Sequence, residues 1–497
     1  MTPAPGQVGV ALMRSGVVLL LAFGALAGGA GYWMVVRGPE LATAPDNPAV
    51  IAARRSAVRG HIRDRDGTIL AGSRRNANGE PYRVYGDDAV APVIGYASAR
   101  YGTAGLERSY DAQLLGLPGA DPAADLLAKF TGERADPADL TLTLSLPLQR
   151  AAVRLLGDDR GAVVMLDPRT GEILVLASTP TFDASAIAAP ASAEAAFVAV
   201  TDDPSAPLLP RATQGRYVPG SVFKIVTAIA ALGSGAIEPA TTFPEQPAAE
   251  RTGLLVSGFR VRDGHHPSTG RRALDLVGAT EASCNIYYAL AGLRTGGGAL
   301  ADWAGRLGFG EPIPFDLPTG TSQMTGGGGP LAGGFADDVE LANAAFGQAE
   351  VLVTPLQMAL VAGTVANDGV LMRPHLVAAI ESERGGRRTI EPEAWRTVLP
   401  VAKARAIREA MIRAVEGDLG RRFTSGADVP GMLVAGKSGT AELGGSGEPH
   451  SWFIGFAPAD DPVVAIAVIV ERGGRGGERA APLAGEMLRR YFATVAP

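Results

Sequence analysis

The sequence predicts an α+β fold in which an antiparallel sheet is covered by helices, preceded by a small β-rich domain and one transmembrane helix. Two apolar runs, residues 162–166 and 173–177, are joined by a turn sequence and predict a hairpin of central strands. Helical segments follow, and the last third of the chain returns to three strands and a final amphipathic helix. Strands at both ends of a helical region favour a single antiparallel sheet with helices packed on it.

The remaining elements follow from periodicity and from turn residues. The region before residue 145 is loop-rich, and Asp66-Gly67 between short apolar runs indicates a turn in a small β element. We therefore expect a β-rich N-terminal domain over residues 37–145 and a large domain over 146–497. In the large domain we expect helices over residues 147–156, 221–232, 274–293, 340–346, 355–367 and 482–492, and further strands over 432–435 running into Lys437, 452–456 and 462–471.

Residues 15–36 carry no charged side chain and predict a single transmembrane anchor. A helix of that length spans about 33 Å, enough for a hydrocarbon core of roughly 30 Å. Tyr32 and Trp33 near its end suit a membrane interface. The alternative is a cleaved signal peptide, because Ala25-Leu26-Ala27 fits a cleavage site. We favour the anchor because the apolar sequence continues to residue 36, which leaves residues 1–14 as a short tail.

The composition excludes some classes of protein. The 497 residues include 45 Lys+Arg and 51 Asp+Glu, a net charge of −6, which argues against a basic nucleic-acid-binding face. A single cysteine, Cys284, permits no internal disulfide and is interpreted as a small buried residue. His265 and His266 have no third ligand at a suitable spacing, so we expect no metal and no cofactor. The basic residues include only four lysines, namely Lys129, Lys224, Lys403 and Lys437.

Ser221-Val222-Phe223-Lys224 follows Pro219-Gly220 and marks the start of a helix. Lys224 lies one turn after Ser221 on the same face, within reach of its hydroxyl. A buried lysine that loses its proton can activate a serine nucleophile, whereas arginine cannot. The alternative for this motif alone is a capping serine with a surface lysine.

Two further motifs carry side chains that suit the same chemistry. Ser283-Cys284-Asn285 is an S-x-N triplet, and its alternative is a pair bonding its own backbone. Residues 437–440, Lys-Ser-Gly-Thr, offer a cation and two hydroxyls to an anion at the end of a predicted strand. Gly439 leaves room there for a substrate backbone to approach.

Residues 431–438 also fit the P-loop pattern G-x-x-x-x-G-K-[ST]. A P-loop requires a helix after its glycine-rich turn so that helix amides hold phosphate. The variable residues here are strand-like, and residues 439–447 are too rich in glycine to form a helix. We therefore reject an ATPase.

In this order the three motifs resemble those of the serine penicillin-binding protein and β-lactamase superfamily. The chain is similar to a class B penicillin-binding protein, a monofunctional peptidoglycan D,D-transpeptidase. The transpeptidase resemblance lies in residues 161–183, 215–228, 345–377, 436–442 and 449–458, and residues 59–71 and 102–116 resemble the N-terminal domain called the pedestal. The family often has Asn where this chain has Pro210, just before Arg211.

The resemblance implies a role for each motif residue. Ser221 is the expected nucleophile, which attacks the penultimate D-Ala and releases the terminal one, and Lys224 is the expected base. Ser283 would relay protons, and Asn285 would orient the peptide and Lys224. Lys437, Ser438 and Thr440 are expected to bind the substrate carboxylate beside Gly439, and the amides of Ser221 and Thr440 to form the oxyanion hole.

The resemblance also implies partners and a location. The expected partners are stem peptides as D-Ala-D-Ala donor and amine acceptor, β-lactams, and a membrane glycosyltransferase, in cell-wall synthesis serving cell shape or division. We expect the N-terminus inside the cytoplasmic membrane and the catalytic domain outside. No domain of the size of a glycosyltransferase precedes the pedestal, so we do not expect a bifunctional class A enzyme. Alternatives are a D,D-carboxypeptidase, a β-lactamase, a β-lactam sensor and a non-catalytic cell-wall scaffold.

Overall fold

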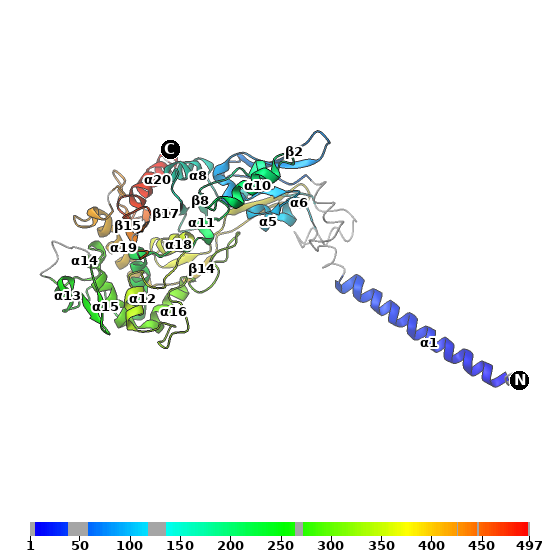
Figure 1. Ribbon diagram of the computed structural model, residues 1–497, viewed down its shortest axis with the longest axis horizontal. Helices are drawn as coiled ribbons and strands as arrows, with labels where there is room; N and C mark the ends of the chain where they lie inside the picture. The colour runs from blue at the N-terminus through cyan, green and yellow to red at the C-terminus, as the bar shows by residue number, and fades with distance from the viewer. Residues whose placement is uncertain are drawn as a thin grey trace.

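The computed structural model describes residues 5–37, 58–117, 136–263, 272–424, 426–444 and 447–495. An N-terminal helix lies apart from a folded body, and that body contains a small β-rich region and a larger α+β region (Figure 1). The α+β class expected from the sequence is confirmed. His265 and His266 lie outside the described residues.

The large region is built on a five-stranded sheet in which every neighbouring pair is antiparallel. The predicted hairpin is present, and its strands lie beside the strands from the end of the chain. The order across the sheet is β15 (Ala435–Ala441), β16 (His450–Ala457), β17 (Val464–Val470), β7 (Gly161–Leu166) and β8 (Ile173–Thr179).

Helices cover both faces of this sheet, and strand alternation sends successive side chains into two cores. Val163 and Met165 enter one core with α8 (Leu146–Leu156) and α20 (Ala480–Val495). Val164 enters the other core with α18 (Pro355–Ala366), which is buried along its whole length. Because both faces are covered, the central strands read as continuous apolar runs rather than as alternating ones.

One helical prediction differs from the structure, and one long helix was not predicted. The predicted helix 274–293 is two helices, α14 (Leu276–Glu281) and α15 (Asn285–Thr295), because Ser283 adopts a left-handed backbone with φ of 55°. The long helix α19 (Val401–Glu416), which packs against α14 and β15, was not predicted. Its many charged residues hide the apolar stripe formed by Ile407 and Met411.

The other elements of the large region are short. The nucleophile motif begins in a 3₁₀ turn, η3 (Gly220–Phe223), that leads into α12 (Lys224–Ser234). The remaining helices are α9 (Ala184–Ala188), α10 (Ala193–Asp202), α11 (Arg211–Gln214), α13 (Gln246–Thr252), α16 (Gly297–Arg306), α17 (Asp338–Ala344) and η4 (Gly420–Arg422), and the remaining strands are β9 (Leu254–Val256), β10 (Phe259–Val261), β11 (Val370–Met372) and β14 (Ala394–Thr397).

The small β-rich region contains a six-stranded sheet that draws strands from the pedestal and from a distant part of the chain. Its order is β13 (Gly386–Thr389), β12 (Val377–Ser382), β6 (Asp139–Leu142), β1 (Ile62–Arg63), β2 (Ile69–Arg75) and β3 (Pro81–Tyr85). Strands β12 and β13 therefore belong to this sheet although they follow the predicted boundary at residue 145. The predicted turn at Gly67 links β1 and β2. The smaller elements are η2 (Asp88–Val90), α4 (Ala91–Ile94), β4 (Ala97–Ser98), β5 (Gly102–Thr103), α5 (Gly105–Ser109) and α6 (Asp111–Leu115).

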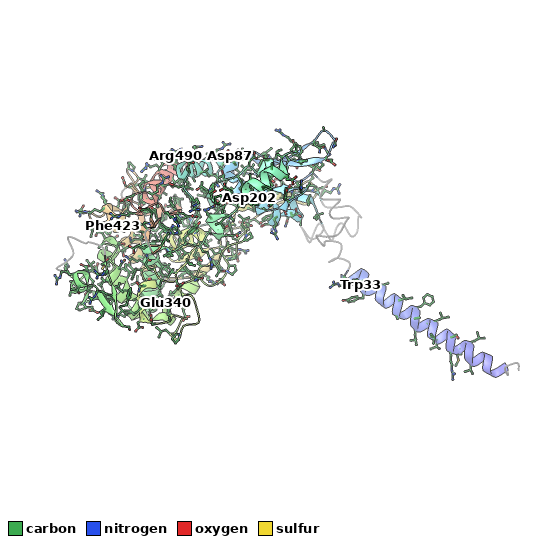
Figure 2. All side chains as sticks on the ribbon, viewed as in Figure 1. Trp33, Asp87, Asp202, Glu340, Phe423 and Arg490 are labelled. Carbon is green, nitrogen blue, oxygen red and sulfur yellow. The ribbon has the colours of Figure 1, made fainter. Side chains whose placement is uncertain are left out.

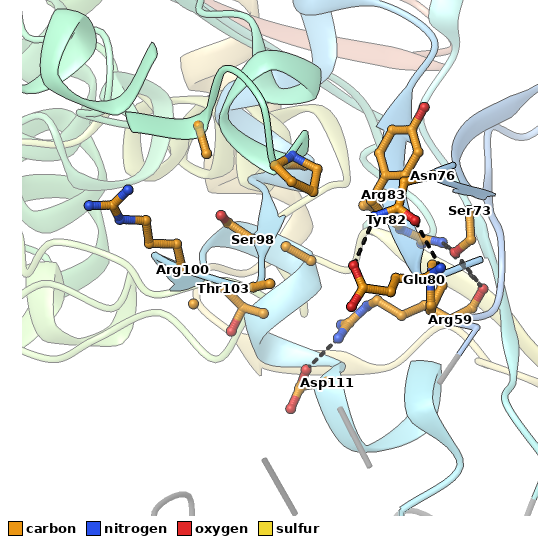
Figure 3. A pocket seen from close by; sticks show the side chains of 17 residues that line it. Arg59, Ser73, Asn76, Glu80, Tyr82, Arg83, Ser98, Arg100, Thr103 and Asp111 are labelled. Carbon is orange, nitrogen blue, oxygen red and sulfur yellow. Dashed lines mark hydrogen bonds and ion pairs between the residues drawn. The ribbon is translucent and has the colours of Figure 1, made fainter. Parts of the chain in front are cut away.

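A cavity of about 620 Å³ opens in the pedestal. Figure 3 shows Arg59 paired with Asp111 on one side of it and Ser98 and Arg100 on the other. Beneath this wall the buried carboxylate of Glu107 pairs with Arg59 at 2.8 Å and with Arg83. None of the motif residues lines this cavity, so it is separate from the chemistry that the sequence predicts.

The N-terminal helix α1 (Pro5–Gly31) continues into a π-helical turn, η1 (Tyr32–Arg37). Its segment Leu12–Gly31 is long and apolar enough to cross a membrane and has no part buried against the protein. Figure 2 shows Trp33 at the end of this helix that leads toward the folded body. These properties fit a single-pass membrane protein.

Candidate active site

Ser221 lies in the turn η3, which is pressed against strand β15. Gly220 has φ of 56° and its amide donates to the Gly347 carbonyl at 2.9 Å. A Cβ atom at Gly220 would come within 2.5 Å of the Thr440 carbonyl oxygen. Only glycine fits both the backbone angle and this contact, so the residue before Ser221 fixes the nucleophile turn beside the K-S-G-T strand.

Lys224 begins helix α12 and is completely buried. Its ammonium group donates to Asn285 Oδ1 at 2.7 Å, to Ser283 Oγ at 3.2 Å and to the Ser283 carbonyl. Burial lowers the pKa of Lys224 to about 8, against an opposing effect from the Asp263 carboxylate. A lysine in this state can exchange a proton near neutral pH.

The break between α14 and α15 places Ser283 where both motif lysines reach it. Its Oγ accepts a hydrogen bond from Lys437 Nζ at 2.9 Å, in addition to the one from Lys224. Cys284 then caps α15, because its Sγ accepts from the Tyr287 amide at 3.3 Å. The S-x-N triplet is therefore a helix start whose first residue turns toward the lysines.

Lys437 is buried inside strand β15, where its Nζ also donates to the Ser438 carbonyl at 3.0 Å. Burial, followed by the charge of Lys224, holds the pKa of Lys437 well below its ordinary value. One hydroxyl, that of Ser283, thus joins two amines that repel each other when both are charged. It can accept a proton from one amine while it donates its own to the other.

The K-S-G-T residues lie within strand β15 rather than at its end, and Gly439 has a different neighbour from the one expected. A Cβ atom at Gly439 would meet the Pro219 carbonyl at 2.8 Å and the Val222 amide nitrogen at 3.1 Å. Gly439 therefore lets the nucleophile turn pack on the strand. Ser438 is buried, whereas Thr440 is half-buried and its Oγ1 accepts from the Gly476 amide at 3.2 Å.

The structure excludes the P-loop geometry for residues 431–438. Residues 433 and 434 are outside any strand, β15 begins at Ala435, and the next element after β15 is strand β16. The expectation that residues 432–435 form a strand is wrong except at Ala435. Among the described residues, no helix that could bind phosphate follows β15 directly, so the P-loop remains excluded.

Some neighbours of the site were not predicted from the sequence. Asp263 accepts from the Ile286 amide at 3.4 Å, and Glu250 lies near Cys284 Sγ, which is 3.6 Å from its Oε1. The ligand atoms of Glu250, Asp263 and Cys284 all lie within 4.8 Å of one another. Cys284 is buried as expected, but it faces carboxylates, which no spacing in the sequence indicated.

Together the fold and the site define a serine-type D,D-transpeptidase of the penicillin-binding class. Residues 161–489 match the penicillin binding protein transpeptidase domain, and residues 59–140 match the penicillin binding protein A dimerisation domain. The chain belongs to the penicillin-binding protein transpeptidase family.

Named relatives resemble the chain over nearly its whole length. Peptidoglycan D,D-transpeptidase PbpA of Mycolicibacterium smegmatis is 35% identical, and the match covers 96% of each chain. Penicillin-binding protein A of Mycobacterium tuberculosis, solved as a ceftriaxone acyl-enzyme complex, is 31% identical with a TM-score of 0.76, over 88% of this chain and 99% of that one. Pseudomonas aeruginosa PBP2 is 25% identical with a TM-score of 0.74, over 89% and 99%.

Proposed function

We propose that this chain cross-links peptidoglycan as a D,D-transpeptidase and that Ser221 is its nucleophile. The observation that carries the assignment of residues is the Ser283 hydroxyl, which lies within hydrogen-bond distance of both Lys224 and Lys437. This arrangement supplies a base next to the nucleophile turn and a route for the proton to the leaving group.

Acylation then follows in balanced steps. Neutral Lys224 takes the proton of Ser221 Oγ as that oxygen attacks the carbonyl carbon of the penultimate D-Ala. The amides of Ser221 and Thr440 stabilise the tetrahedral oxyanion. The carbon–nitrogen bond breaks, and the terminal D-Ala leaves as an amine with the proton returned from Lys224 through Ser283. An ester on Ser221 remains.

Transfer to the acceptor reverses the proton path. The amine of a second stem peptide attacks the ester carbon, its proton passes through Ser283 to Lys224, and the new amide forms as Ser221 regains its proton. Earlier, during acylation, Lys437, Ser438 and Thr440 hold the terminal carboxylate of the donor, beside Gly439, while Asn285 orients the donor chain. If water replaced the amine, the product would be that of a D,D-carboxypeptidase.

The apolar helix α1 and the relatives support a membrane location. We propose that residues 15–36 anchor the chain with residues 1–14 in the cytoplasm and the pedestal (37–145) and transpeptidase domain (146–497) outside, where peptidoglycan lies. A transpeptidase consumes glycan strands, so a membrane glycosyltransferase is its natural partner. Protease treatment of intact spheroplasts tests the orientation, because only an outward catalytic domain is digested.

Covalent labelling tests the function directly. The full-length protein in detergent should form a stable adduct with fluorescent penicillin, and Ser221→Ala should form none. Ser234→Ala, at the far end of α12, is the matched control and should label like the wild type. Equal labelling of Ser221→Ala and wild type would overturn the assignment. Labelled enzyme that releases D-Ala from a pentapeptide without joining an acceptor amine would instead indicate a carboxypeptidase.

A further inference from the structure

A largely buried carboxylate, that of Glu471, ties together three segments of the chain directly after strand β17. Its Oε1 accepts from Arg211 Nε at 2.8 Å and from Tyr217 Oη at 2.9 Å, and its Oε2 pairs with Arg160 Nε at 3.1 Å. Burial works to raise the pKa of Glu471, but the bonds from Arg211 and Tyr217 outweigh it and lower the pKa. The carboxylate is therefore ionised under physiological conditions.

Arg211 is the most deeply buried partner, with 2% of its side chain exposed. Its other guanidinium nitrogens donate to the carbonyls of Ser205 and Ala206, at 2.6 Å and 3.0 Å. The ion pair with Glu471 thus fixes the loop before α11 as well as α11 itself. Separation of this ion pair would leave a buried positive charge without its carboxylate, which is strongly unfavourable. The loop and the end of β17 are therefore held as one unit.

Tyr217 carries this constraint toward the nucleophile, which lies four residues further along the chain. Its backbone exchanges two hydrogen bonds with Val353, both at 2.9 Å. Its ring meets Trp452 edge-on at 6.2 Å, and Trp452 Nε1 donates to the Val218 carbonyl at 3.0 Å. Trp452 is also the β16 residue opposite Gly439 of the K-S-G-T strand. The segment leading to Ser221 therefore packs on Trp452 of β16, the residue that pairs with Gly439 of the K-S-G-T strand.

We propose that Glu471 is a positioning residue for acyl transfer, which acts through Arg211 and Tyr217 to fix the segment that presents Ser221 to strand β15. The proposal rests on the proposed role of Ser221 as the nucleophile. Glu471 itself touches neither motif lysine among the described contacts. Its effect is geometric, because a displacement of about 1 Å at a nucleophile can cost roughly a hundredfold in rate.

The test compares Glu471→Gln and Tyr217→Phe with a matched control in the full-length protein. Asp368→Asn is the control, because Asp368 also bridges two arginines, Arg405 and Arg408, but lies away from the nucleophile segment. Saturating acylation by fluorescent penicillin separates the binding constant from the acylation rate constant. Melting temperatures are measured for every variant.

We expect Glu471→Gln to lower the acylation rate constant by roughly tenfold or more and Tyr217→Phe by less, with the binding constant unchanged. Asp368→Asn should be acylated at the wild-type rate even if its melting temperature falls as much as that of Glu471→Gln. Acylation by Glu471→Gln within twofold of the wild type would overturn the proposal, as would an equal loss in Asp368→Asn. Ser221→Ala separates the two hypotheses. Its full labelling would defeat the proposed nucleophile and with it the role of Glu471, whereas loss of labelling in Ser221→Ala together with normal acylation by Glu471→Gln would defeat only the role of Glu471.

Discussion

At the scale of single residues, the site depends on two amines that share one hydroxyl. Lys224 and Lys437 are both buried, and the charge of Lys224 makes the positive charge of Lys437 more costly. Both could be singled out in the sequence because the chain uses arginine for almost all its other basic positions. The role of Ser283 between them could not, since it depends on a left-handed backbone at one residue, which no local pattern specified.

The lowered pKa of Lys224 predicts how acylation varies with pH. Lys224 must be neutral to accept the Ser221 proton, so the acylation rate should rise with pH and level off above about 8. The unfolded chain holds this proton up to the ordinary lysine pKa of 10.5, so the free energy of unfolding should also rise from about pH 8 to 10.5. Stopped-flow labelling with penicillin checks the rate. Lys403→Gln, which removes a lysine of α19, is the control and should leave the pH profile unchanged. An acylation rate of the wild type that stays constant from about pH 6 to about pH 9 would contradict the prediction.

At the scale of elements, the site is made by the contact of a 3₁₀ turn with a strand. Turn η3 and strand β15 come together only because Gly220 and Gly439 lack side chains at the contact. The strands β7, β8, β16 and β17 and the helices α8, α12, α18 and α20 were predictable because their apolar runs are long. The break between α14 and α15 and the helix α19 were not, because tertiary packing overrides a continuous helical pattern in one case and charged residues mask an apolar stripe in the other.

Substitution of Gly439 by alanine tests this contact. The new Cβ would meet backbone atoms of Pro219 and Val222, which cannot rotate away, so turn and strand must separate. We expect the free energy of unfolding to fall by about 1–3 kcal/mol and acylation to be nearly lost. Gly305→Ala, in helix α16 with open space around its Cβ, is the control and should be stabilising. Wild-type acylation by Gly439→Ala would show that the contact is not required.

At the scale of the whole molecule, the pedestal and the transpeptidase region share a sheet. Strand β12 pairs antiparallel with β6, which places Val377 opposite Leu142. The predicted boundary at residue 145 was based on a change of sequence pattern. A local sequence pattern does not indicate which distant strand a given strand will pair with, so the pairing of β12 with β6 could not be predicted. The division at residues 145 and 146 stays a prediction about the chain, and the sheet crosses it.

Removal of the pedestal should therefore damage the remaining domain. A chain that starts at residue 146 would leave the edge of β12 without its partner β6, and an unpaired strand edge promotes aggregation. We expect a lower soluble yield and a lower melting temperature than for a chain that starts at residue 58. Equal yield and equal melting temperature for the two truncations would show that β12 does not need the pedestal.

The shared sheet also sets an order of events during biosynthesis. Ribosomes release the chain from its N-terminus, so β1, β2, β3 and β6 emerge long before β12 and β13, the strands that complete their sheet. Until strand β12, which ends at Ser382, has been synthesised, the pedestal has an open edge at β6. Folding of the pedestal sheet therefore waits for synthesis of the later region, and a chaperone that shields unpaired strands would find its binding surface at β6 during that interval.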